Sequence, residues 1–314
     1  MSYPDFDSKS AALYQRARKV LPDGNSRTTI AIKPYPIYLA QASGAEVIDV
    51  DNNHYIDFNN NYTSLLHGHA FEPVQNAVKA QLQKGTAYSF TTELEIELAE
   101  LLCGRVDSFQ QIRFCNSGSE AVMNMLKAAR AFTGKPKIAK IEGLYHGSYD
   151  FAEVSLKNKP QDRNGSKPIS TAYSFGTPES VLHEVIALPF NEIDATEALI
   201  KQHAESLACI MIDLMPQTMS MVSPSNEYLQ ALVKISKEHR ILLAFDEVIS
   251  FRLSYSGGQG MFGIEPDITS LGKIIGGGFP VGAIAGRKDV MSVFEPEEGQ
   301  PAKLPHGGTF NGNP

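Results

Sequence analysis

Lys273 is the residue whose type and surroundings most clearly suggest chemistry. It lies in a turn with a glycine directly before it and, after two isoleucines, three glycines at positions 276–278. A lysine held in a tight, partly apolar turn loses solvation, so its pKa falls and its amine can act as a nucleophile. From this stretch alone, a surface lysine in a glycine-rich turn is the alternative interpretation.

An acidic pair, Asp246 and Glu247, directly follows the apolar run at residues 241–245. Burying an unpaired carboxylate is costly, so an acid at the end of a buried strand indicates a cationic partner. Pyridoxal phosphate needs a lysine that forms a Schiff base and an acid beside its pyridinium nitrogen. Lys273 and Asp246 together therefore favour a site for this cofactor.

A small polar turn at residues 116–121 lies between a predicted strand and a predicted helix. The free N–H groups at the start of a helix and the helix dipole favour an anion. Ser117, Gly118 and Ser119 are therefore candidates for binding a phosphate. Ser117 and Glu120 also have the spacing of a capping box, which needs no ligand. Both interpretations stay open at this turn.

Tyr145 and His146 follow a predicted strand at residues 137–141. Open α/β sheets bind ligands at the carboxyl ends of their strands, so these two side chains are placed where a ligand would lie. Residues 155–177 have little periodicity and are predicted to form a long loop, a kind of segment that often forms part of a functional site.

The elements that would position these residues alternate between strand and helix, which predicts an α/β fold with a mostly parallel central sheet and helices on both faces. The predicted strands are residues 111–115, 137–141, 207–213, 241–245, 267–271 and 281–285. Because carboxyl ends of parallel strands meet at one edge of a sheet, we expect the four chemically interesting turns to lie together.

The N-terminal part has a different pattern. Apolar residues recur with helical spacing at 8–21, and residues 46–58 alternate and reverse as in a β-hairpin. We therefore divide the chain into an N-terminal segment, residues 1–70, and a large domain, residues 71–314.

The composition excludes several classes of function. The 314 residues carry a net charge of −7, which gives no electrostatic footprint for nucleic acid or an anionic membrane. No apolar run approaches the ~20 residues of a membrane-spanning helix. Three widely spaced cysteines predict reduced thiols and a cytoplasmic location. His67 and His69 have no further ligand at suitable spacing, so we predict no metal site.

Five motifs, taken in order, resemble those of a class III, fold-type I pyridoxal-phosphate aminotransferase. They are residues 116–121, 145–147, 245–248, 271–278 and 306–314. The most similar branch is that of glutamate-1-semialdehyde aminomutase and the related β-amino-acid aminotransferases. The resemblance implies pyridoxal 5′-phosphate as cofactor, amino-acid and keto-acid substrates, and a homodimer. It also implies a small C-terminal α/β domain beyond the position of Pro314, which this chain would lack.

The resemblance implies roles for single residues. Lys273 would form the aldimine with the cofactor and then move the substrate proton, and Asp246 would keep the pyridine nitrogen protonated. Val248 would press on one face of the ring and Tyr145 would cover the other. The other residues implied to bind cofactor are Ser117, Gly118, Ser119 and His146. Thr309 would reach the phosphate bound by the partner subunit.

Arg27 matches the arginine that pairs with a substrate carboxylate in this branch, a task that suits a planar guanidinium. Two residues that would bind substrate depart from the aminomutase pattern, because Tyr62 replaces a tryptophan and Thr218 replaces an asparagine. We therefore predict an aminotransferase for a carboxylate-bearing α- or β-amino acid. The alternatives are glutamate-1-semialdehyde 2,1-aminomutase, an isomerase of tetrapyrrole synthesis, and a non-catalytic protein that binds the cofactor.

Overall fold

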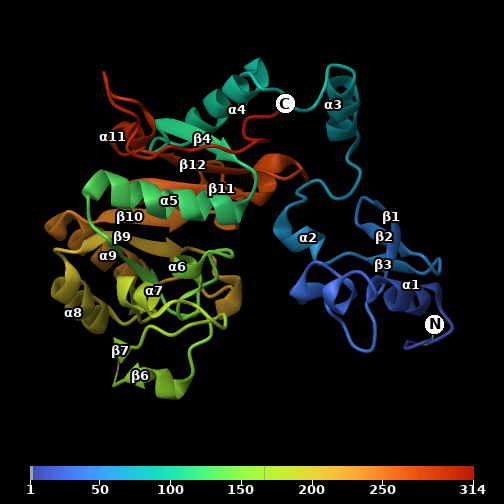
Figure 1. Cartoon of the computed structure of the whole chain (residues 1–314), viewed down its shortest axis with the longest axis horizontal. Coiled ribbons are helices and arrows are strands. Elements are labelled where there is room, and N and C mark those ends of the chain that lie inside the picture. The colour runs from blue at the N-terminus through green and yellow to red at the C-terminus, as the bar shows by residue number, and fades with distance from the viewer. Residues whose placement is uncertain (1–2, 166) are drawn as a thin grey trace. The chain divides into compact units, whose positions relative to one another are not determined.

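The computed structural model describes residues 3–165 and 167–314. The chain forms two compact units, residues 1–84 and 85–314 (Figure 1). Every described helix is too short or too polar to span a lipid bilayer.

The first unit contains a three-stranded antiparallel sheet with short helices. Its elements are α1 (Lys9–Ala17), η1 (Pro22–Gly24), η2 (Thr28–Ile30), β1 (Leu39–Ser43), β2 (Glu46–Asp49), β3 (His54–Ile56), α2 (Asn60–Thr63) and α3 (Glu72–Leu82). Strands β2 and β3 form the expected hairpin, with Val47 opposite Tyr55. The predicted boundary at residue 70 lies before α3, which belongs to this unit.

A seven-stranded sheet forms the centre of the second unit, in the order β4-β12-β11-β10-β9-β5-β8. The strands are β4 (Gln111–Cys115), β5 (Lys137–Ile141), β8 (Val185–Leu188), β9 (Leu207–Asp213), β10 (Leu242–Asp246), β11 (Ile268–Gly272) and β12 (Gly282–Gly286). Strand β12 runs antiparallel to both of its neighbours, and the other six strands share one direction. The predicted α/β class with a mostly parallel sheet is confirmed.

Helices pack on both faces of this sheet, and the alternation along β10 explains why. Leu242 and Ala244 belong to one apolar cluster, together with residues of α5 (Gly118–Thr133). Leu243 and Phe245 belong to another, together with residues of α8 (Ile193–His203) and α9 (Asn226–His239). A strand that is apolar at every position is typical of a sheet covered on both sides.

The remaining elements of the second unit are shorter or lie at its edges (Figure 1). They are α4 (Glu93–Cys103), α6 (Asp150–Glu153), η3 (Pro160–Asp162), β6 (Arg163–Asn164), β7 (Lys167–Pro168), α7 (Glu179–Glu184), η4 (Gln217–Met219), η5 (Ser250–Leu253), α10 (Gly257–Phe262), η6 (Lys273–Gly276), α11 (Lys288–Met291) and η7 (Ser292–Phe294). The predicted long loop contains η3 and the two-stranded sheet of β6 and β7. Arg163 fastens this loop by ion pairs with Glu142, just past β5, and with Glu192.

Candidate active site

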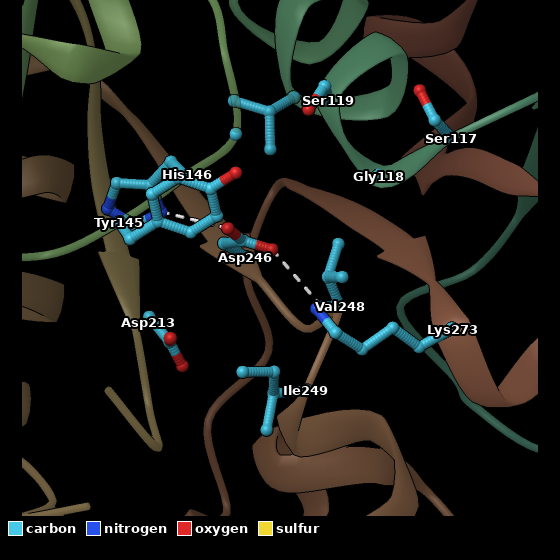
Figure 2. A pocket seen from close by; sticks show the side chains of 12 residues that line it. Ser117, Gly118, Ser119, Tyr145, His146, Asp213, Asp246, Val248, Ile249 and Lys273 are labelled. Carbon is cyan, nitrogen blue, oxygen red and sulfur yellow. Dashed lines mark hydrogen bonds and ion pairs between the residues drawn. The ribbon is translucent and has the colours of Figure 1, made fainter. Parts of the chain in front are cut away.

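The turns that follow β4, β5, β10 and β11 meet at one edge of the large sheet, as expected. They enclose a cavity of about 160 Å³ (Figure 2). All the residues predicted to bind cofactor line this cavity except Thr309, and both predicted catalytic residues, Lys273 and Asp246, are among them. The side chains come from sequence positions more than 150 residues apart, so the sheet topology is what brings them together.

Asp246 is buried and is held by three hydrogen bonds. Its Oδ1 accepts from the backbone N–H of Val248 at 3.1 Å and from the hydroxyl of Ser270 at 3.0 Å. Its Oδ2 accepts from Nδ1–H of His146 at 2.8 Å. Burial alone would raise the pKa of Asp246, but the bond from His146, together with the Val248 bond and the charge of Lys273, lowers it below its usual value. The carboxylate is therefore ionised and fixed in place.

His146 is fully buried beside Asp246 and has one free nitrogen. Its Nε2 has no hydrogen-bond partner among residues 3–165 and 167–314. Burial lowers the pKa of His146, and the bond with Asp246 opposes this shift only in part. A buried polar atom without a partner is uncommon in folded proteins and calls for an explanation.

Lys273 enters the cavity from the turn after β11. Its backbone φ is 47°, in the left-handed region that residues other than glycine rarely adopt, and such strain is often found at functional sites. The side chain is half-buried, and burial lowers its pKa, while the charges of Asp246 and Asp213 oppose the shift. A larger share of neutral amine is present near neutral pH than for an exposed lysine.

The turn after β4 caps α5, and it also leaves backbone N–H groups at the start of that helix free to bind a ligand. The Ser117 hydroxyl accepts from the Glu120 N–H at 3.2 Å, as a helix N-cap does. The N–H groups of Gly118 and Ser119 lie in the first turn of the helix, where no intrahelical acceptor exists. A Cβ at Gly118 would lie 3.0 Å from the methyl groups of Val248, so a glycine allows the turn to lie close to that side chain. Capping and anion binding are therefore compatible here.

The turns after β4 and β5 are also joined to each other. The backbone N–H of Ser148 donates to the Ser119 hydroxyl at 3.2 Å. Gly147 has a φ of 88°, and a Cβ there would collide with Ser119. This contact positions Tyr145, a 40% exposed side chain at the cavity, near the start of α5.

Asp213 is a cavity residue that the sequence reasoning did not single out. It ends the predicted strand at 207–213 in the same way that Asp246 ends β10, and that signal was available from the sequence. Burial, and next the charge of Asp246, raise the pKa of Asp213 to about 8. One cavity thus contains two carboxyl groups with opposite pKa shifts.

Two predicted residues of the second unit lie outside the cavity lining. Thr309 is exposed in the C-terminal segment, which Arg113 fastens by a 2.8 Å hydrogen bond to His306. Thr218 lies in η4, in the segment that follows β9. The predicted roles of both residues stay predictions.

Arg27 and Tyr62 belong to the first unit, where they contact each other. The guanidinium carbon of Arg27 lies 5.8 Å from the ring centre of Tyr62, and Nη1 donates to Asn61 Oδ1 at 3.2 Å. Residues 60–63 all have positive φ values between 44° and 71°, so Tyr62 is carried by a strained turn. Arg27 also lines a largely apolar hollow of about 430 Å³ in this unit.

The residues of the cavity fit pyridoxal phosphate on their own chemistry. An ionised buried carboxylate suits a pyridinium nitrogen, a lysine with a lowered pKa suits an aldehyde, and free helix N–H groups suit a phosphate. The chain also matches the family model described as aminotransferase class III over residues 30–314. The chain belongs to the class III aminotransferases. It is a pyridoxal-phosphate-dependent enzyme with small-molecule substrates.

Named relatives fall into two groups by activity. An omega-transaminase from Sphaerobacter thermophilus is 52% identical with a TM-score of 0.97, and the match covers 99% of this chain and 71% of that one. A β-phenylalanine aminotransferase from Variovorax paradoxus is 34% identical with a TM-score of 0.84, over 97% and 65% of the two chains. A glutamate-1-semialdehyde 2,1-aminomutase from Methanocella arvoryzae is 39% identical over 97% of this chain and 70% of its own length.

The described residues contain no group of three or more side chains that could hold a metal ion. His69, one of the two histidines considered for metal binding, instead pairs with Asp57 at 2.7 Å. The three cysteines are free thiols.

Proposed function

We propose that this enzyme is an aminotransferase that moves an amino group between a carboxylate-bearing amino acid and a keto acid. The observation that carries the proposal is the position of Lys273 and the ionised Asp246 in one cavity. Pyridoxal phosphate, when bound, supplies an electron-accepting ring that stabilises negative charge on the substrate carbon. The residues of this chain bind and orient that ring and move the substrate proton.

Asp246 would hold the ring nitrogen, because a carboxylate beside that nitrogen favours its protonated form. The hydrogen bonds from His146 and Ser270 fix the direction of the carboxylate. The first turn of α5, at Gly118 and Ser119, would bind the phosphate through N–H groups that have no intrahelical acceptor.

Lys273 would remove and return the proton at the substrate carbon that bears the amino group. Its Nζ must be neutral to accept a proton, and burial lowers its pKa in that direction. Val248 and Tyr145 line the same cavity and would cover the two faces of the ring, which keeps water away from the reacting carbon.

Arg27 would bind the substrate carboxylate through its planar guanidinium, which Tyr62 and Asn61 hold within the first unit. A homodimer in which Thr309 contributes to the partner's phosphate site is part of the proposal, and so is a cytoplasmic location.

An amino-donor screen tests the proposal. The purified enzyme loaded with pyridoxal phosphate is mixed with single α- or β-amino acids, and the visible absorbance of the bound cofactor is followed. We expect at least one carboxylate-bearing donor to bleach the band and a keto acid to restore it. If no amino acid changes the spectrum, the aminotransferase proposal fails and a non-catalytic cofactor-binding protein is favoured.

Glutamate-1-semialdehyde 2,1-aminomutase is the second candidate, because the named relatives at 38% to 41% identity over 97–98% of this chain carry that name. Tyr62 and Thr218, which replace a tryptophan and an asparagine in the aminomutase pattern, favour the transaminase. Incubation with glutamate 1-semialdehyde and no added amino donor separates the two. Formation of 5-aminolevulinate at the rate of transamination or faster would favour the aminomutase.

A further inference from the structure

Two carboxyl side chains are neighbours at the edge of the sheet. Asp213, the last residue of β9, pairs in register with Asp246, the last residue of the parallel strand β10. Adjacent strands lie about 4.8 Å apart and residues in register face the same side, so the two carboxyls are close. Each residue is only 5% exposed. Water therefore screens their repulsion very little.

The two carboxyl groups have different partners. Asp246 accepts hydrogen bonds from a backbone N–H, a hydroxyl and an imidazole. Asp213 accepts one, from the backbone N–H of Met215 to Oδ1 at 2.8 Å. Its Oδ2 has no hydrogen-bond partner among the residues that the structure describes, although the side chain lines the cavity. A second negative charge is thus disfavoured on Asp213.

The pKa shifts agree with this difference. Burial and the nearby charge of Asp246 raise the pKa of Asp213, against the bond from Met215 and the charge of Lys273. The pKa of Asp246 is lowered. Groups whose pKa values are pushed apart in this way take different protonation states. The charged and titratable groups on the neighbouring strands and turns are Asp246, Glu247, Lys273, His146 and Lys140.

We propose that Asp213 is a positioning residue that donates a hydrogen bond from its protonated carboxyl group to the hydroxyl oxygen of the pyridoxal ring. This inference rests on the cofactor site proposed above but not on the reaction catalysed there. An ionised oxygen on the ring is an acceptor, and a neutral carboxyl group is a donor that adds no second negative charge beside Asp246.

The chemistry of the ring indicates which edge Asp213 would meet. The ring nitrogen and the aldehyde carbon are at opposite corners, so one edge between them carries the phosphate arm and the other carries the hydroxyl. Asp246 and Lys273 are suited to the two corners, and the start of α5 to the phosphate. In Figure 2, Ser119 and Asp213 lie on opposite sides of Asp246, which leaves Asp213 on the hydroxyl edge.

Infrared spectra of the full chain test the protonation state, with and without cofactor. We expect a protonated carboxyl band at neutral pH in the cofactor-free protein, with a midpoint near the pKa of about 8 raised by burial and Asp246. The band should be missing in Asp213→Asn. It should titrate at lower pH in Asp246→Asn, because the neighbouring charge is removed. Absence of the band in the parent protein would overturn the proposal.

Measurements of cofactor affinity test whether the ring hydroxyl oxygen accepts the hydrogen bond from Asp213. Equilibrium dialysis compares pyridoxal phosphate with an analogue in which hydrogen replaces the ring hydroxyl. We expect Asp213→Ala to bind pyridoxal phosphate about 10- to 100-fold more weakly, the range for one hydrogen bond to a charged group. The affinities of the parent protein and of Asp213→Ala for the analogue should agree within about threefold. An equal loss for both compounds would overturn the proposal, because Asp213 would then act only on the fold of the cavity.

Asp213→Asn keeps the test valid if the alanine variant does not fold. The amide has the same shape and remains a donor at every pH. We expect the ratio of cofactor affinities, parent over Asp213→Asn, to fall as pH rises through about 8, because only the parent loses its donor. A ratio that stays constant over that range would contradict the proposal, even if the enzyme proves to be an aminotransferase.

Discussion

Nδ1–H of His146 donates to Oδ2 of Asp246 over 2.8 Å, and both side chains are shielded from water. The two residues lie 100 positions apart in the sequence and meet because β5 and β10 both pair with β9. This bond lowers the pKa of Asp246 against the effect of burial. The charge that would hold the cofactor nitrogen therefore depends on a second residue.

His146→Ala should weaken cofactor binding, and more strongly as pH falls. Removing the donor raises the pKa of Asp246, so the carboxylate becomes protonated at a higher pH than in the parent protein. One hydrogen bond to a charged group is worth about 1.5–3 kcal/mol, so we expect about a tenfold or greater loss of affinity at mildly acidic pH. Equilibrium dialysis over a pH series measures it.

His146→Asn is the matched control for this change, because its amide can donate from a position near that of Nδ1. It should restore most of the affinity at each pH. Equal losses in both variants would show that the packing of the imidazole, and not its hydrogen bond, is what matters.

Lys273→Ala should slow transamination strongly and shift the visible absorbance of bound cofactor, because no amine remains to react with its aldehyde. The amine is the nucleophile and the group that moves the substrate proton, and general acid–base groups contribute about 10²- to 10⁴-fold. We expect at least about a 10³-fold loss of rate in the assay with the best donor. Lys234→Ala, a 71% exposed lysine on α9, is the control and should be unchanged. Full activity without Lys273 would refute the assignment.

Arg27→Ala should raise the KM for a carboxylate-bearing donor by about 10- to 100-fold, the value of one charge-assisted hydrogen-bonded pair. The KM for an amine without a carboxylate should not change. Arg27→Lys keeps the charge but loses the planar fork, so we expect it to recover only part of the effect. Steady-state kinetics with both donors checks this, and an equal change for both would exclude a carboxylate partner.

Asp213→Asn should stabilise the cofactor-free protein by an amount that grows with pH. The folded pKa of Asp213 is about 8 and the unfolded value is near 3.8, so the folded state binds more protons between these values. Stability contributed by this group therefore falls as pH rises from about 4 to about 8 and is level above that. The asparagine does not titrate, so its advantage should reach a few kcal/mol by about pH 8.

Urea denaturation of parent and variant at several pH values measures this difference in the free energy of unfolding. Asp289→Asn removes an exposed carboxylate whose pKa is lowered by Arg287, so it should destabilise the protein by an amount that stays level between about pH 5 and pH 8. If the free energies of unfolding of parent and Asp213→Asn differ by the same amount at about pH 5 and at pH 8, Asp213 is ionised in the folded protein.

The sequence was a good guide wherever one local pattern determines the structure. The predicted bounds of β4, β5 and β9 agree with the structure, because short apolar runs between polar turns leave little choice of register. The gathering of Lys273, Asp246 and the turn at Ser117 followed from the parallel order of the strands. Strand β8 has only four residues between two helices, and so short an apolar run cannot be distinguished from part of a helix by its pattern.

Other features depend on contacts between distant residues, so local pattern could not reveal them. The bond between His146 and Asp246 requires the order of strands in the sheet, which the sequence does not state. Asp213, like Asp246, is an acid at the end of an apolar strand, so the sequence could have indicated it as a site residue. That Asp213 lies beside Asp246 follows only from the register of β9 and β10. The contact of Arg27 with Tyr62 depends on the positive φ values of residues 60–63.

The reversed strand β12 lies between β4 and β11, yet the turn after β4 crosses the start of β12 and reaches the end of β11. A Cβ at Gly282 would collide with the Ser117 carbonyl, and a Cβ at Gly272 would lie 3.3 Å from Gly118 Cα. Glycines at these two strand ends therefore bring the phosphate-type turn next to the strand that delivers Lys273, and the sheet, not the connecting loops, positions both. Insertions or deletions in loops such as residues 155–177 can thus be tolerated without altering the spacing that the cofactor requires.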